Sequence, residues 1–142
     1  TYIFFIMSKI IMTPVNLVSK TLTHHGKRAK IDYKREKDFE ENGHNVKWDD
    51  SKYNNAIVGD YFAFVHNIQD RAEIYRIERI SLAETRPNYW DLPNHQRRNV
   101  LHFSSMIKEI PWHELKNLLG YNETYYLQGT TRSKKNILIQ DG

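Results

Sequence analysis

The sequence predicts one small mixed α/β (α+β) domain, and three observations lead to that prediction. The chain has 142 residues, close to the usual length of a single domain, so one domain is expected over residues 1–142. Hydrophobic residues make up 39% of the chain and aromatic residues 13%, enough to close a compact interior. Short aromatic segments of strand composition are combined with a segment of helical spacing.

An opening strand and a charged segment are the first elements expected. The apolar run at residues 2–7 is interpreted as a strand, because a membrane-spanning helix needs roughly 20 residues. It also lacks the preceding positive charge of a signal peptide. Residues from about 13 to 43 are strongly charged and are expected to form a flexible or helical surface segment. No interaction with a membrane is expected.

The middle of the chain predicts a β-hairpin. Gly59 and Asp60 form a turn signal before the aromatic run at residues 61–65, which is expected to be a strand. Residues 66–70 are interpreted as the hairpin loop. Residues 72–80 are expected to form the second strand, since their composition and hairpin context outweigh the helical spacing of their isoleucines.

The last part of the chain predicts a loop, two strands and a helix. Residues 85–94 are expected to form a long loop because they contain two prolines and two asparagines. Residues 100–104 are interpreted as a strand. Residues 111–119 are interpreted as a short helix, with proline at its first position and Gly120 after its end. Residues 124–127 are expected to form the last strand.

No catalytic motif in the sequence is complete. His113 and Glu114 begin like a zinc-protease helix, but Asn117 stands where the second histidine is needed. Cysteine is absent, which excludes disulfides and cysteine nucleophiles and fits an intracellular location. Asp60 and Glu73 are either the paired carboxylates of a metal-dependent nuclease or a turn aspartate and a solvent-facing glutamate. We expect no cofactor and no enzymatic activity.

Charge and tryptophan placement point to a polyanionic partner. The formal net charge is +4, which favours association with phosphate backbones. Trp48 and Trp90 both lie in polar neighbourhoods, where they either stack on a flat base or close the edge of a small core. The pair Arg97 and Arg98 and the run at residues 132–135 either contact phosphates or are ordinary surface charges.

Several features occur in an order that is typical of one family. They are the opening segment 3–9, Trp48 followed by Asn54, the turn and strand 59–64, the segment 89–93 before the strand 100–103, and the closing segments 110–112 and 128–132. In this order the chain resembles the PUA-like superfamily and, within it, the YTH and EVE domains. The resemblance covers most of the chain and implies a small PUA-like β-barrel flanked by short helices. The charged segment at about 13–43 is then a variable insertion.

This resemblance implies a monomeric reader of RNA or DNA that accepts a flipped-out modified base in an aromatic pocket. The implied base-binding residues are Trp48, Ser51, Asn54 and Trp90. The candidate phosphate-binding residues are Arg97, Arg98, Arg132, Lys134 and Lys135. Residues 97–99 are cationic and polar where a third apolar wall would fall, so a modified cytosine or another base is as compatible as N6-methyladenine. The alternatives are the nuclease and a protein-interaction domain without a nucleic-acid role.

Overall fold

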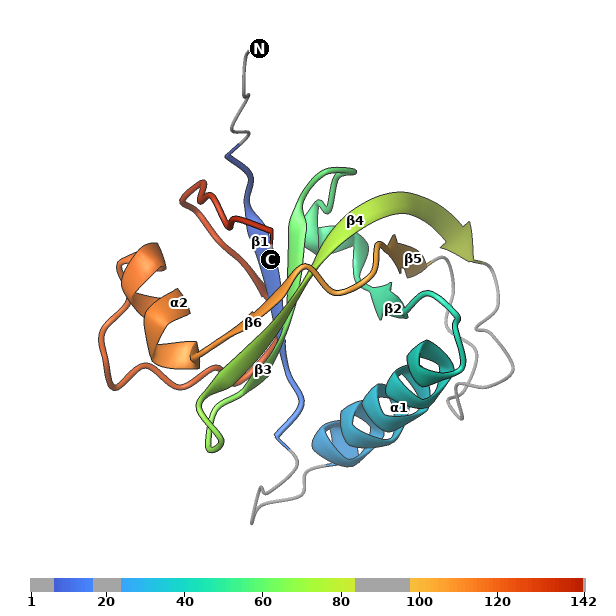
Figure 1. The fold of residues 1–142 in the computed structure, drawn as a ribbon, viewed down its shortest axis with the longest axis horizontal. Helices are drawn as coiled ribbons and strands as arrows, with labels where there is room; N and C mark the ends of the chain where they lie inside the picture. Colours follow the sequence, from blue (N-terminus) through green and yellow to red (C-terminus); the bar gives the residue numbers. More distant parts are fainter. Residues whose placement is uncertain (1–6, 17–23, 84–97, 142) are drawn as a thin grey trace.

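Two helices lie on opposite sides of a curled mixed sheet (Figure 1). The computed structural model describes residues 7–16, 24–83 and 98–141. Its strands are β1 (Ile10–Pro14), β2 (Lys47–Asp50), β3 (Tyr61–His66), β4 (Arg71–Ala83), β5 (Arg98–Phe103), β6 (Lys108–Ile110) and β7 (Thr131–Arg132). Its helices are α1 (His24–Glu41), α2 (Trp112–Leu119) and the 3₁₀ turn η1 (Lys52–Asn54). This architecture confirms the α+β class predicted from the sequence, with a sheet that curls into a half barrel.

The long strand β4 organises the sheet. The strand order is β2-β5-β4-β3-β1-β7, and β6 is a further partner of β4. The first half of β4 pairs with β3 and β6, and its second half pairs with β5. The register with β5 shifts between Ile77 and Arg79, and such a bulge bends a strand and increases its twist. The strands β1 and β3 pair in parallel, so both begin at the same end of the sheet.

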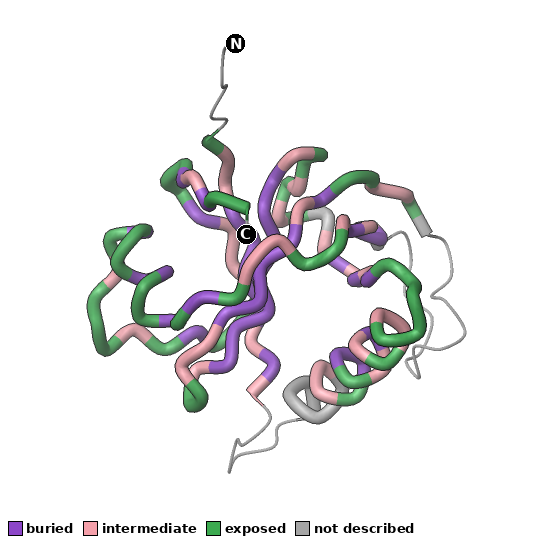
Figure 2. The backbone as a smooth tube through the Cα atoms, in the orientation of Figure 1, coloured by how far each residue is buried: buried purple, intermediate pink, exposed green. Residues whose placement is uncertain are grey.

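The central strands are buried on both faces (Figure 2). Side chains alternate along a strand, so the odd-numbered residues of β3 face α2 and the even-numbered residues face α1. The core on the α2 side includes the helix residues Trp112, Leu115 and Leu119. The core on the α1 side is mainly aromatic and includes Tyr33, Trp48, Phe62, Phe64, Tyr75 and Phe103.

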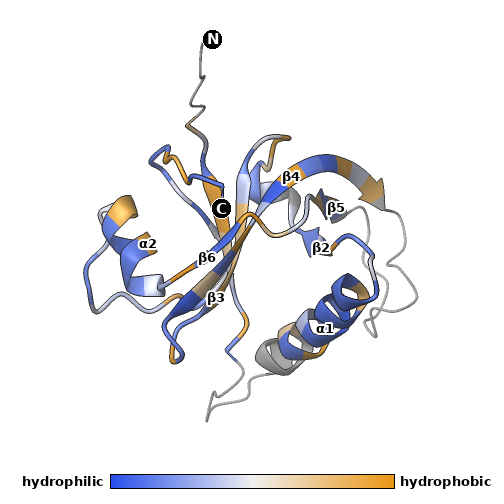
Figure 3. Cartoon of the chain, viewed as in Figure 1, coloured by the Kyte–Doolittle hydropathy of each residue, from blue (hydrophilic) through white to orange (hydrophobic). Residues whose placement is uncertain are grey.

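Helix α1 is strongly hydrophilic (Figure 3), although one side of it is buried. Among its residues 29–41, the buried ones are Asp32, Tyr33 and Glu36. The Oε2 atom of Glu36 accepts a hydrogen bond of 2.9 Å from the backbone N–H of Lys47, at the start of β2. Polar groups are buried at acceptable cost only when they find such partners, so polar contacts hold α1 on the sheet. No helix in the described part of the chain combines the length and apolar character needed to cross a membrane.

Several predicted elements are confirmed. The strands β3, β4 and β5 match the runs predicted at 61–65, 72–80 and 100–104, and α2 matches the helix predicted at 111–119. The hairpin turn predicted between β3 and β4 is also present. Helix α1 falls in the charged segment for which a flexible or helical structure was expected. With 18 residues, it is longer than the short helices that the resemblance implies.

The beginning and the end of the chain differ from the prediction. The opening strand was expected at residues 2–7, which lie largely outside the described residues; Met7 is in no strand, and the first described strand is β1. The strand predicted at residues 124–127 is wrong. The N–H and C=O groups of Leu127 bond to the side-chain amide of Asn67, at 2.9 and 3.0 Å, and not to a neighbouring strand.

Candidate functional site

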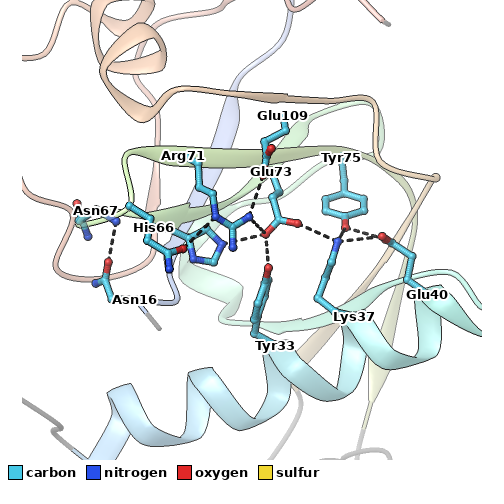
Figure 4. Close-up of polar contacts among 11 residues, drawn as sticks. Asn16, Tyr33, Lys37, Glu40, His66, Asn67, Arg71, Glu73, Tyr75 and Glu109 are labelled. Atoms are coloured by element: carbon cyan, nitrogen blue, oxygen red, sulfur yellow. Dashed lines mark hydrogen bonds and ion pairs between the residues drawn. The ribbon is translucent and has the colours of Figure 1, made fainter. Parts of the chain in front are cut away.

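A cluster of ionisable side chains lies between α1 and the β3–β4 hairpin (Figure 4). We call it the helix-docking network; its members are Tyr33, Lys37 and Glu40 from α1 and His66, Arg71, Glu73 and Tyr75 from the hairpin. Residues four apart on a helix share one face, which is why Tyr33 and Lys37 both point at the sheet. Alternation along β4 points Glu73 and Tyr75 toward the helix.

Glu73 is the centre of the helix-docking network. Its side chain is only 5% exposed. Its Oε1 atom accepts hydrogen bonds from the Tyr33 hydroxyl and, at 2.9 Å, from Nε2 of His66. Its Oε2 atom lies 2.8 Å from Nζ of Lys37, and Nη1 of Arg71 lies 3.3 Å from Oε1. A carboxylate oxygen only accepts hydrogen bonds, so His66 carries a proton on Nε2.

These contacts change the pKa values of the network. Burial by itself would raise the pKa of Glu73, but the hydrogen bonds from His66, Lys37 and Tyr33 outweigh it and lower the pKa from 4.5 to about 2. Burial and the hydrogen bond to Glu73 raise the pKa of Tyr33. Burial acts to lower the pKa of Lys37, but its hydrogen bonds to Glu73 and Glu40 outweigh burial and raise it. These three groups are therefore locked in their ordinary protonation states at neutral pH, which does not suit proton transfer.

The remaining contacts close the network. Lys37 donates to the hydroxyl of Tyr75 at 2.8 Å and pairs with Glu40 at 2.9 Å. The Tyr75 hydroxyl in turn donates to Glu40 at 2.7 Å, and Arg71 pairs with Glu109 at 2.8 Å. Among the seven residues of the network, one buried side-chain atom, Nδ1 of His66, has no hydrogen-bond partner in the described part of the chain. Each cation thus has an anionic partner, as expected of a network that fixes α1 on the sheet.

A second polar cluster lines a cleft at the end of the sheet where β1 and β3 begin. We call it the end cleft; its charged lining residues are Lys9, Asp60, Arg76 and Arg132, and its apolar lining residues include Met7, Ile57 and Val58. Ile57 and Val58 are 58% and 59% exposed, so the cleft offers apolar surface to a ligand. Three cations face one carboxylate, and the end cleft therefore carries an excess of positive charge.

Arg76 is held in the end cleft by neutral groups. It lies opposite Tyr61 in the β3–β4 register, with its guanidinium carbon 4.0 Å from the centroid of the tyrosine ring. Its Nη1 atom donates to the carbonyl of Gly59 at 2.7 Å and to the hydroxyl of Ser8 at 3.3 Å. Its Nη2 atom donates to the Tyr61 hydroxyl at 3.1 Å. Its position is fixed, and its charge is not neutralised by any of these contacts.

Arg132, a predicted phosphate-binding residue, lies in the end cleft but is paired. Its Nε and Nη2 atoms donate to Oδ2 of Asp60 at 3.2 and 3.0 Å. The side chain of Asp60 is 3% exposed and that of Arg132 is 22% exposed. Lys134 and Lys135, also predicted to bind phosphate, are exposed directly after β7. Phosphate binding by these three residues stays a prediction.

Trp48 lies in the core on the α1 side. It is 8% exposed and packs edge-on against Phe64, with ring centroids 5.0 Å apart, and at a tilt against Phe62. The sequence left two alternatives for this residue, and its placement matches a tryptophan that closes a core. Whether it also stacks on a base stays a prediction.

The polar residues predicted to bind the base follow β2. Nδ2 of Asn54 donates to Asp50 at 2.6 Å, and Oγ of Ser51 accepts from the backbone N–H of Tyr53 at 3.2 Å. These bonds order η1, so both side chains already have partners within the chain. Their role in base binding stays a prediction.

The other predicted site residues are not described. Trp90 and Arg97 lie outside the described residues, and only the backbone of Arg98 is described, at the start of β5. The pairing of Trp48 with Trp90 around a base therefore stays a prediction.

Asp60 and Glu73, the carboxylates of the nuclease alternative, are far apart. Glu73 lies opposite Phe64 in the β3–β4 register, and Asp60 comes four residues before Phe64, which is about 13 Å along a strand. Their partners also differ, since Asp60 binds Arg132 and Glu73 binds Lys37. Glu73 is buried, so it is not the solvent-facing glutamate expected either. The described residues contain no group of three or more metal-binding side chains.

A serine and a histidine also meet on β4 and β5, but their protons are wrongly placed for catalysis. Nε2 of His102 lies 2.9 Å from Oγ of Ser81, and Nη2 of Arg79 lies 3.2 Å from Nδ1. A guanidinium only donates, so Nδ1 accepts and the proton is on Nε2. The imidazole then donates to Ser81, whereas a general base would have to accept the serine proton.

Three residues that are placed where they could contact a ligand were not predicted as site residues from the sequence. Arg76 and Lys9 line the end cleft, and Tyr53 is 92% exposed between Ser51 and Asn54. The position of Arg76 could have been inferred from the predicted hairpin. If Val65 and Ala72 are paired beside the turn, Arg76 lies opposite Tyr61, at the end of the hairpin away from the turn. No such inference was possible for Lys9, because its position depends on β1, which was not predicted.

Comparisons with known proteins add no match. No family model matches the chain, and searches of curated proteins and of solved structures found no similar protein. The basis for a functional proposal is therefore the order of sequence features together with the geometry of the end cleft.

Proposed function

We propose that this protein binds nucleic acid through the end cleft and recognises a modified base, as a monomeric PUA-like domain of the YTH or EVE type. The charge balance of the cleft is the observation that carries this proposal. Lys9, Arg76 and Arg132 face it against the single carboxylate of Asp60. Lys and Arg side chains that gather on one surface supply the electrostatic part of nucleic-acid binding.

The apolar lining of the end cleft supports the same partner. Ile57 and Val58 expose apolar surface beside the cations, so a sugar or base can be covered while its phosphate is bound. Lys134 and Lys135 are exposed and follow Arg132 within three residues along the chain, so they add positive charge close to it. A small inorganic anion would not contact these apolar side chains favourably, whereas a nucleotide has apolar surface that can cover them.

Base recognition is assigned to the aromatic residues of the sequence pattern. Trp48 and Trp90 would stack on the base, with Ser51 and Asn54 as hydrogen-bonding groups. Packing against Phe64 and Phe62 holds Trp48 rigid, which is a requirement of a stacking wall.

Binding of fluorescent oligonucleotides tests this proposal. RNA and DNA strands, each with and without modified bases, are titrated with the full chain over a series of salt concentrations. Affinity is expected to fall as salt rises, because bound phosphates release counterions, and a modified strand is expected to bind more tightly than its unmodified match. Absence of binding at low salt would favour a protein-interaction domain, and strand cleavage on addition of Mg²⁺ or Mn²⁺ would favour a nuclease.

A further inference from the structure

The two arginines of the end cleft differ in their partners. Arg132 donates two hydrogen bonds to one oxygen of Asp60, so a carboxylate already neutralises its charge. Arg76 donates to Ser8, Gly59 and Tyr61 through a hydroxyl, a carbonyl and a phenol, all of them neutral. Among the described residues no carboxylate forms an ion pair with Arg76. Of these two cations, Arg76 is therefore the one whose charge is available.

The guanidinium of Arg76 is also positioned before any ligand arrives. The ring of Tyr61 covers one face of it, and three oxygens fix its orientation. These bonds use three of the five N–H groups of a guanidinium, which leaves two for a ligand. A fixed cation with free donors at the wall of an open cleft suits a phosphate, because little conformational freedom is lost on binding.

We infer that Arg76 binds a backbone phosphate in the end cleft, and that Asp60 limits the contribution of Arg132 by pairing with it. This inference rests on the proposed function. It names phosphate as the group bound in the end cleft and assigns a larger contribution to Arg76 than to Arg132. A phosphate beside Arg76 would lie in the field of Lys9 as well. Arg132 would contribute fully only when it is released from Asp60.

Affinity measurements on three variants test the division of roles. Arg76→Gln is expected to lower the affinity for a single-stranded oligonucleotide about tenfold at low salt and to reduce the slope of log affinity against log salt by about one. Arg132→Gln is expected to lower the affinity by about threefold or less. Asp60→Asn, which removes the competing charge, is expected to raise the affinity about threefold. Equal losses for the two arginine variants, or a loss for Asp60→Asn, would overturn the inference.

Arg79→Gln is the matched control, because Arg79 is on the same strand and the substitution removes the same charge outside the end cleft. It is expected to change the affinity by less than about twofold. A loss equal to that of Arg76→Gln would show that net charge alone matters. If Arg76→Gln does not fold, Arg76→Lys replaces it: the affinity is expected to fall about threefold with an unchanged salt slope, and parental affinity would overturn the inference.

Inorganic phosphate separates this inference from the proposed function. The melting temperature of the parent chain is expected to rise with phosphate concentration, and that of the Arg76 variant to rise much less. If phosphate acts in this way but no oligonucleotide binds, the phosphate site stands and the nucleic-acid function fails. If oligonucleotides bind the parent and Arg76→Gln equally, with equal salt slopes, the nucleic-acid function stands and the role of Arg76 fails. If neither probe binds, both fail.

Discussion

The helix-docking network and the end cleft are both built on the strands β3 and β4, but they differ in whether a charged side chain has partners of opposite charge. Glu73 and Arg76 are near neighbours on β4, and the alternation of side chains sends them to opposite faces of the sheet. The charge of Glu73 is surrounded by Lys37, Arg71, His66 and a tyrosine hydroxyl. Arg76 is bound only to neutral oxygens.

This difference separates a structural role from a binding role. A buried charge whose partners are all present stabilises one arrangement of the chain, and removing a partner leaves an uncompensated charge in the interior. A fixed cation that lacks an anionic partner at the wall of an open cleft retains an attraction for anions from solution. We therefore expect changes in the helix-docking network to alter stability, and changes in the end cleft to alter binding.

Glu73→Gln is expected to have the largest effect on stability. The neutral amide leaves Lys37 and Arg71 without their central anion, and breaking a buried charge network costs about 3 to 5 kcal/mol. Urea unfolding of parent and variant measures the difference. The control is Glu109→Gln, since Glu109 also pairs with Arg71 but its side chain is 47% exposed, and a change within about 0.5 kcal/mol is expected. Equal effects of the two substitutions would contradict a central role for Glu73.

Trp48→Ala is expected to have the next largest effect. Trp48 fills the aromatic core beside the network, so truncation should reduce the free energy of unfolding by about 3 to 4 kcal/mol. Tyr53→Ala is the control, because a tyrosine that is 92% exposed should contribute less than about 0.5 kcal/mol. If Trp48→Ala unfolds like the parent, Trp48 does not support the core. Loss of discrimination for a modified base in the oligonucleotide titration would support its proposed stacking role in addition to its packing role.

Acid should weaken the helix-docking network through Glu73. The pKa of Glu73 is about 2 in the folded chain against an ordinary 4.5, so the stabilisation is fully present above about pH 4.5 and is lost as pH falls toward 2. The total loss of stability is about 3 kcal/mol, because each unit of difference between the folded and the ordinary pKa corresponds to about 1.4 kcal/mol. Urea unfolding at a series of pH values measures the loss.

Lys37→Gln tests whether Glu73 is the group that causes the loss of stability in acid. The hydrogen bond from Lys37 is one of the contacts that lower the pKa of Glu73, so the variant should lose less stability between neutral pH and acid than the parent does. A variant with the same acid-induced loss as the parent would show that Glu73 is not the group responsible.

The parts of the fold that were predicted correctly are those specified by local patterns. The hairpin β3–β4 has aromatic and β-branched strands around a turn, and α2 has proline before it and Gly120 in the left-handed conformation after it. The strands β1 and β7 depend on distant partners. Thr131 and Arg132 lie in a polar run and form a strand because they pair with Met12 and Ile11 of β1.

The candidate site was predicted only in part, for a similar reason. Arg132 was expected to bind phosphate from its charge, but its pairing with Asp60 joins residues that are far apart in the sequence. Glu73 was considered as a metal ligand or a surface residue. Every second residue of a strand lies on the same face, so Glu73 shares a face with Tyr75 and Ile77. A carboxylate on such an apolar face needs cationic partners. The donors on α1 that meet this need could not be inferred without the packing of the helix.

The smallest expected effect tests whether an arginine bound by a neutral acceptor keeps its electrostatic influence. Arg79 donates to Nδ1 of His102, a neutral acceptor like those around Arg76. Burial is the main cause that lowers the pKa of His102 below 6.5, and the charges of Arg79 and Lys47 lower it further. Arg79→Gln should therefore raise the pKa of His102 but leave it below 6.5, as followed by an NMR titration of the imidazole.

Lys47→Gln is the matched control for this titration, because it removes a charge with a weaker influence on the same imidazole. It should raise the pKa of His102 by less than Arg79→Gln does. An unchanged pKa in Arg79→Gln would mean that solvent screens a guanidinium held in this way. The same screening would then apply to Arg76, and the excess positive charge of the end cleft would attract phosphate less than the geometry implies. A rise in pKa would support the opposite conclusion, that a neutral hydrogen-bond partner leaves the charge of an arginine available to its surroundings.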